Sequence, residues 1–132
     1  MIVEAARKYL GVKFRHQGRS RATGVDCAGL VICTLRDIGM TPADSTDYNM
    51  TPDPVQMLSV IVQNAVEIPV ADMMPGDVLW MRFATEPQHV AIVTENGIIH
   101  SYSNRGKVVE HALNDVWCKR IVKCFRVIDE QC

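Results

Sequence analysis

The chain has 132 residues, of which 48% are hydrophobic and 22% charged, and its formal net charge at pH 7 is −1. These values are ordinary for a single globular domain, residues 1–132, that can hold its core without disulfides or metal. No apolar run approaches the ~18 residues of a membrane span, and no aromatic residues interleave with the basic ones to stack on nucleic-acid bases. We therefore expect neither a membrane nor a nucleic acid as a partner.

The first ten residues do not resemble a signal peptide. Glu4, Arg7 and Lys8 lie inside their apolar pattern, whereas a signal peptide places basic residues before an apolar stretch. This order predicts an amphipathic helix, and we expect a protein that is cytoplasmic when synthesised.

Five cysteines are present, at positions 27, 33, 118, 124 and 132. The odd number and wide spacing argue against a disulfide framework. There is no Cys-x-x-Cys pair, and the interval from Cys118 to Cys124 is too long for a zinc knuckle. We expect no metal and no cofactor.

The first half of the chain predicts helices. Apolar residues recur at helical spacing, and glycines 11 and 39 follow two of the segments as helix stops. Asp26 is a good N-cap for the second segment. The predicted helices cover residues 2–10, 27–38 and 55–66, with a loop rich in Gly, Arg and Ser at residues 12–24.

The second half predicts an antiparallel sheet. Short turns, among them Pro75-Gly76-Asp77 and Glu95-Asn96-Gly97, separate apolar runs, and such short connections require antiparallel pairing. The predicted strands cover residues 78–83, 89–94, 98–102, 107–111 and 121–128. Helices followed by an antiparallel sheet make the fold class α+β.

Charge is distributed unevenly along the chain. Residues 1–36 hold seven bases and two acids, and residues 37–77 hold seven acids and no base. Solvated surface explains such runs by default. The alternative is a basic lip around an active site, formed by the loop that precedes Cys27, which would attract an anionic substrate. The residues expected to contact substrate in that case are Arg15, His16, Arg19, Arg21 and Asp26.

Cys27 opens the second predicted helix. Unpaired N–H groups and a partial positive charge at a helix N-terminus favour a thiolate, and the same N–H groups can serve as an oxyanion hole. A free cysteine is more often a small buried hydrophobic residue, as Cys33 is expected to be. Cys27 therefore needs a partner to count as a nucleophile.

His89 and His100 supply such a partner. They lie on two strands joined by the turn at residues 95–97, so pairing of these strands brings the two imidazoles together. One ring can then act as a general base while the other fixes its tautomer and orientation. His111 has no comparable partner in the sequence and is expected at the surface.

Four short motifs resemble one known family, the NlpC-type cell-wall cysteine peptidases. Residues 24–30 (Gly-Val-Asp-Cys-Ala-Gly-Leu) are similar to its nucleophile motif, and residues 74–79 (Met-Pro-Gly-Asp-Val-Leu) to its Pro-Gly-Asp turn. Residues 89–92 (His-Val-Ala-Ile) and 99–101 (Ile-His-Ser) are similar to its two histidine strands. The motifs occur in the family's order over nearly the whole chain.

The resemblance implies a papain-like fold, with N-terminal helices that carry the cysteine packed on a sheet that carries both histidines. It implies Cys27 as nucleophile, His89 as general base and His100 as orienting group. The implied reaction is hydrolysis of the γ-D-glutamyl–diamino acid bond in peptidoglycan stem peptides. Phe14 stands where the family often has a tyrosine, so that hydroxyl is expected to be absent.

The sequence of residues 14–19 (Phe-Arg-His-Gln-Gly-Arg) resembles that of the phage and prophage branch of the family. This resemblance implies tail proteins as partners and a place in the virion. Two other functions remain open. One is an amidase or acyltransferase that uses the same Cys–His pair, and the other is a non-catalytic tail or wall-binding component that keeps the fold.

Overall fold

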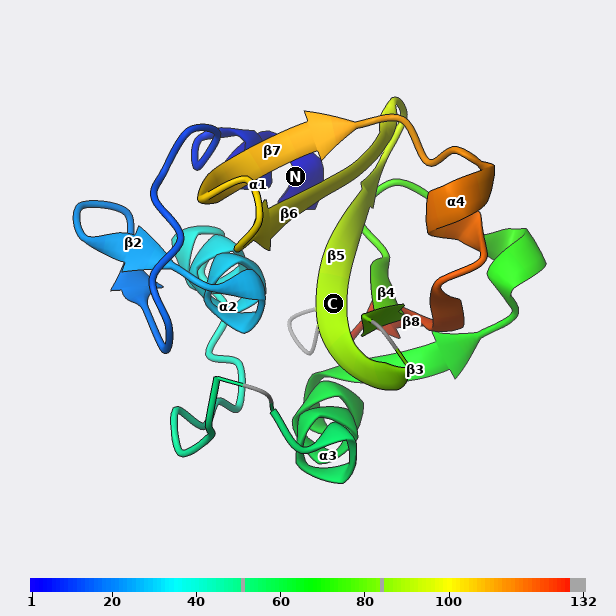
Figure 1. Ribbon diagram of the computed structural model, residues 1–132, viewed down its shortest axis with the longest axis horizontal. Coiled ribbons are helices and arrows are strands. Elements are labelled where there is room, and N and C mark those ends of the chain that lie inside the picture. The colour runs from blue at the N-terminus through cyan, green and yellow to red at the C-terminus, as the bar shows by residue number, and fades with distance from the viewer. Residues whose placement is uncertain (51, 84, 129–132) are drawn as a thin grey trace.

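A six-stranded antiparallel sheet organises the molecule (Figure 1). The computed structural model describes residues 1–50, 52–83 and 85–128, so Cys132 lies outside the described residues. The strand order is β3-β8-β4-β5-β6-β7, which places the last strand between the first two. The strands are β3 (Ala65–Ile68), β4 (Val78–Phe83), β5 (Glu86–Thr94), β6 (Gly97–Tyr102), β7 (Lys107–His111) and β8 (Ile121–Val127).

Helices pack on both faces of this sheet. They are α1 (Ile2–Arg7), α2 (Cys27–Asp37), α3 (Pro54–Asn64) and α4 (Asp115–Cys118), with a 3-10 turn at Val70–Asp72 and a two-stranded ribbon of β1 (Arg19–Ser20) and β2 (Gly24–Val25). Figure 1 shows α2 and α4 on opposite sides of the long, curved β5. No helix in the described ranges has the length and apolar character needed to cross a membrane.

Side chains of β5 alternate between the two faces of the sheet, so this strand packs against helices on both. Ile92 packs with Leu30 and Cys33 of α2, whereas Ala91 and Val93 pack against the residues that contact α4. Successive side chains of a strand point to opposite faces, so one strand contributes to both cores. The α+β, papain-like fold expected from the sequence is confirmed, with the cysteine helix on one face of the sheet.

Most predicted elements are present, with shifted ends. Helix α2 begins at Cys27 with Asp26 as its N-cap, and β4 and β7 have the expected bounds. Helix α3 ends at Asn64, because the next residues form β3 and pair with β8. The expectation that His89 begins its strand is wrong, because β5 already starts at Glu86 and His89 lies inside it.

The partial pairing of β5 opens space for the cysteine helix. Hydrogen-bonded register with β6 covers only Ile92–Thr94, so the earlier part of β5 pairs with β4 alone. Pro87, which has no N–H, is tolerated in this singly paired part. The N-terminus of α2 meets β5 there, and Cys27 packs against the cluster that contains Val90.

Gly29 allows a close approach between α2 and the loop before it. A Cβ built at Gly29 would lie 2.0 Å from the carbonyl oxygen of Gly18. We predict that Gly29→Ala lowers the free energy of unfolding by roughly 1–3 kcal/mol, because the backbone must move to relieve the clash. Glycine to alanine inside a helix normally stabilises by about 1 kcal/mol. Urea unfolding shows whether the free energy of unfolding falls or rises. A variant as stable as the wild type, or more stable, would contradict the close packing.

Candidate active site

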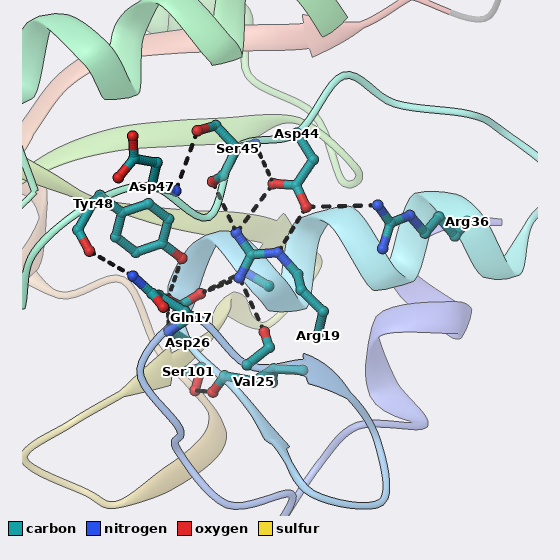
Figure 2. Close-up of polar contacts among 12 residues, drawn as sticks. Gln17, Arg19, Val25, Asp26, Arg36, Asp44, Ser45, Asp47, Tyr48 and Ser101 are labelled. Atoms are coloured by element: carbon teal, nitrogen blue, oxygen red, sulfur yellow. Dashed lines mark hydrogen bonds and ion pairs between the residues drawn. The ribbon is translucent and has the colours of Figure 1, made fainter.

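The carboxylate of Asp26 fixes the start of α2 (Figure 2). Its Oδ1 accepts hydrogen bonds from Gly29 N at 2.7 Å and from Arg19 Nη1 at 3.0 Å. Its Oδ2 accepts from Gln17 N at 2.8 Å and from the Tyr48 hydroxyl. Asp26 is only 5% exposed. Because protein groups use both oxygens, Asp26 positions the residues around Cys27 and has little capacity left to bind substrate.

Cys27 occupies the first position of α2, directly after this cap. The helical N–H groups of its first turn have no carbonyl partner within the helix. Burial and the charge of Asp26 raise the pKa of the thiol to about 12, although N–H groups of Val90 and Ala28 oppose the rise. This is opposite to the direction expected from the helix position. Desolvation outweighs the helix terminus, so the resting form is the thiol.

His89 and His100 form a buried hydrogen-bonded pair. The distance from His89 Nε2 to His100 Nδ1 is 2.6 Å, and the side chains are 3% and 0% exposed. Burial, together with the neighbouring imidazole and Arg120, lowers the pKa of His89 well below its usual value. Burial, His111 and Arg120 lower the pKa of His100 to about 3. Both rings are therefore neutral near pH 7.

Cys27 and His89 line the same cavity, of about 160 Å³. No hydrogen bond joins the Cys27 sulfur to His89 in the described residues, and catalytic hydrogen bonds are often long in the absence of substrate. One wall of the cavity is apolar and comes from α3, including Met57, Val60 and Ile61. Its other lining residues include Phe14, His16, Tyr48, Gln88 and Ser103.

Aromatic rings hold the two imidazoles in place. Phe83 stacks on His89 with ring centroids 4.1 Å apart, and Trp117 packs edge-on against His100 at 5.1 Å. The Arg120 guanidinium lies over the Trp117 ring at 4.5 Å. These contacts exclude water and restrict the ring orientations, which is what a general base requires.

The basic side chains of the loop before Cys27 do not gather at the cavity. His16 lines it and packs edge-on against Tyr48, with ring centroids 5.5 Å apart. Arg19 forms ion pairs with Asp26 and Asp44 that leave its side chain 12% exposed, so it belongs to the scaffold (Figure 2).

The other two arginines of the loop point elsewhere. The Arg21 guanidinium lies over the ring of Tyr9, whose hydroxyl donates to Asp37 at the far end of α2. That end is about 15 Å from Cys27 along the helix. Arg15 is exposed next to His16 and is not among the residues that line the cavity. Of the five residues expected to contact substrate, His16 and Asp26 therefore line the cavity, and the three arginines do not.

Three side chains of the candidate site escaped the sequence argument. His111 lies 2.9 Å from His100, Trp117 packs on the rings of both, and the Tyr48 hydroxyl donates to Asp26 beside Cys27. The expectation that His111 has no partner is wrong. One signal was available, since histidines 89, 100 and 111 recur at equal intervals on three successive strands. No group of three or more His, Cys, Asp or Glu in the described ranges is arranged to hold a metal ion.

The neutral, buried state of His100 predicts a pH-dependent stability. The pKa of His100 is lowered from 6.5 to about 3, so between these values the unfolded chain binds a proton that the folded protein does not. The free energy of unfolding therefore falls as pH falls through this window, by about 2 kcal/mol at pH 5 relative to pH 7.5. Urea unfolding at both pH values measures it, and His100→Asn should lose about that much of the dependence. Equal dependence in both proteins would contradict the buried neutral ring.

The raised pKa of Cys27 predicts how alkylation depends on pH. In a Cys118→Ser background, which removes an exposed thiol, iodoacetamide should modify Cys27 about tenfold faster for each unit between pH 6 and pH 8. Peptide mapping by mass spectrometry separates Cys27 from the buried Cys33 and Cys124. A rate independent of pH over this range would instead indicate a preformed thiolate.

Comparison with known proteins places these features in a family. The model of the NlpC/P60 family matches residues 11–126. The chain is 27% identical over 120 residues to the curated protein "Probable endopeptidase NlpC" of Escherichia coli K12, covering 89% of this chain and 70% of that protein.

Solved structures share the fold. The NlpC/p60 domain of the peptidoglycan hydrolase SagA is 22% identical with a TM-score of 0.68, over 96% of each chain. RipD of Mycobacterium tuberculosis, described as a non-catalytic NlpC/p60 domain protein adapted to peptidoglycan binding, is 15% identical with a TM-score of 0.64, over 96% of this chain and 95% of its own. The chain spans about 40% of two longer matched proteins, from Staphylococcus aureus and Bacillus cereus. With the family model matching most of its length, this chain belongs to the NlpC/P60 family.

Proposed function

We propose that this protein is a cysteine endopeptidase that hydrolyses an amide bond in peptidoglycan stem peptides, of the γ-D-glutamyl–diamino acid type. The observation that carries the proposal is one arrangement: Cys27 at a helix N-terminus shares a cavity with the hydrogen-bonded His89–His100 pair. A nucleophile, a base and a group that orients the base are the parts that acyl transfer through a thioester requires.

The chemistry proceeds in two steps. His89 Nδ1, the nitrogen not bonded to His100, takes the thiol proton as the Cys27 sulfur attacks the substrate carbonyl. The amine leaves with the proton returned by His89, and a thioester on Cys27 remains. Water, deprotonated by His89, then attacks the thioester, and the carboxylic acid and the thiol are released. N–H groups at the start of α2 stabilise the oxyanion of each tetrahedral intermediate.

The substrate class is supported by family membership and by similar proteins described as an endopeptidase and as a peptidoglycan hydrolase. His16 and Ser103 in the lining of the cavity are available to contact the polar groups of a stem peptide, and Arg15 is exposed beside His16. A role with phage tail proteins stays a prediction from the sequence of residues 14–19. It does not alter the chemistry proposed here.

A non-catalytic role is the main alternative, because RipD keeps a similar fold without activity. The hydrogen bond between His89 and His100 favours catalysis. A wall-binding module has no need for two buried imidazoles, whose neutral burial costs stability at acidic pH. An amidase or acyltransferase would use the same thioester and differ only in the acceptor that resolves it.

Muropeptides with defined stems test the proposal. We predict cleavage between D-glutamate and the diamino acid, read by mass spectrometry, and no product with Cys27→Ala. His89→Ala should lower turnover by about 10²–10⁴-fold, since it removes the base. His100→Asn should retain measurable turnover, because its amide oxygen can still accept from His89 Nε2, whereas His89→Asn should not.

The controls separate the alternatives. Each variant must show the wild-type circular dichroism spectrum, because both rings pack in the core. Binding of muropeptides without any product would support the non-catalytic role. Transfer of the acyl group to an added amine in preference to water would indicate an acyltransferase.

A further inference from the structure

A third histidine extends the buried pair to the surface. His100 Nε2 lies 2.9 Å from Nε2 of His111, at the end of β7, and the Nδ1 of His111 lies 2.9 Å from the carbonyl oxygen of Ala112. With the 2.6 Å contact between His89 and His100, three imidazoles and one carbonyl form an unbroken line. The line runs from the cavity wall, across β6, to the half-buried edge of the sheet.

The carbonyl gives this line a direction. A carbonyl oxygen only accepts hydrogen bonds, so His111 Nδ1 carries a proton and, in the neutral ring, its Nε2 has a free lone pair. His100 must then donate from Nε2, which leaves its Nδ1 as an acceptor. His89 must in turn donate from Nε2, which leaves its Nδ1 unprotonated. Each tautomer follows from the one before it.

We propose that His111 is a positioning residue that, anchored on the Ala112 carbonyl, selects the tautomers of His100 and His89 and so leaves His89 Nδ1 free to act as the base. This inference rests on the proposed function of His89. It assigns a role to a side chain that is not among the residues lining the cavity. An imidazole prefers to carry its proton on Nε2 in water, so the Nδ1-protonated form of His111 is imposed by its surroundings.

The neighbours of His111 come from α4, β7 and β6. Trp117 of α4 packs on it, with ring centroids 4.9 Å apart, and the Arg120 guanidinium lies over the same indole. The neighbouring carboxylate on β7, Glu110, is held by Arg7 and Thr94 and does not bond to any of the three rings. His100 faces His111 from β6. In the described residues, the side chain hydrogen-bonded to His111 is therefore the neutral His100.

Protonation of His111 would exchange donor and acceptor in both hydrogen bonds between the three rings. An imidazolium donates from both nitrogens, so His100 Nε2 would have to become an acceptor and its Nδ1 a donor. His89 Nε2 would then accept, and its proton would lie on Nδ1, where it blocks removal of the thiol proton. The loss of the correct tautomer in other triads costs about 10⁴-fold in turnover. A positive charge on His111 would therefore prevent His89 Nδ1 from acting as the base.

Nitrogen NMR tests the tautomers without any change at His111. In ¹⁵N-histidine-labelled Cys27→Ala protein at pH 7.5, we expect His89 and His100 to carry the proton on Nε2 and His111 to carry it on Nδ1. Resonances are assigned with single His→Gln variants. A His111 protonated on Nε2, or a His100 protonated on Nδ1, would overturn the inference, whatever the activity of the protein.

A set of substitutions tests the consequence for turnover. His111→Gln offers an amide oxygen to His100 Nε2 and should keep kcat within about threefold, whereas His111→Phe fills the space without an acceptor and should lose about 10–100-fold in kcat with little change in KM. His111→Lys, which only donates, should lose at least as much as His111→Phe.

The outcomes separate the two proposals. No turnover of muropeptides by the wild-type protein would refute the endopeptidase function, and the NMR result would still decide the tautomers. Turnover with equal kcat in the folded Gln, Phe and Lys variants would refute the role of His111 and leave the endopeptidase intact. Folding of each variant is checked by circular dichroism before kinetics.

Discussion

The hydrogen bonds of the Asp26 carboxylate hold the parts of the site in one place. A buried charge is costly unless it is paired and fully hydrogen-bonded, and Asp26 receives donors from α2, from the loop at Gln17, from Arg19 and from Tyr48. Arg19 continues the network to Asp44, which Arg36 of α2 also approaches (Figure 2). The position of Cys27 relative to the cavity walls is therefore set by the residue immediately before it.

The three groups proposed to react or to orient the base, Cys27, His89 and His100, are neutral at rest. Burial raises the pKa of Cys27 and lowers the pKa of both histidines, so a resting thiolate–imidazolium pair is disfavoured on both sides. A carboxylate in place of His100 would stabilise a charged His89, whereas a neutral imidazole orients the ring without doing so. Charge separation then develops when the thiol attacks, where the N–H groups of Val90 and Ala28 already face the sulfur.

The sequence predicted the local features well and the long-range ones less well. Asp26 capping α2, the turn before β6 and the pairing of the two histidines follow from short-range patterns, and all are present. The pKa of Cys27 depends on how deeply the helix end is buried between strands, which no local pattern reports. The isolation of Arg21 depends likewise on the path of β1 and β2, two-residue strands too short to leave a period in the sequence.

Phe14 and Tyr48 show how one chemical group can be supplied from another segment. Phe14, which stands where the family often has a tyrosine, lines the cavity and has no hydroxyl to offer. Tyr48, from the segment between α2 and α3, lines the same cavity and directs its hydroxyl to Asp26. Burial and Asp26 raise the pKa of this phenol, so it remains a hydrogen-bond donor at neutral pH. The hydroxyl is anchored by the same carboxylate that caps α2. It therefore keeps its place relative to Cys27 although its segment, residues 40–53, forms no helix or strand in the described residues.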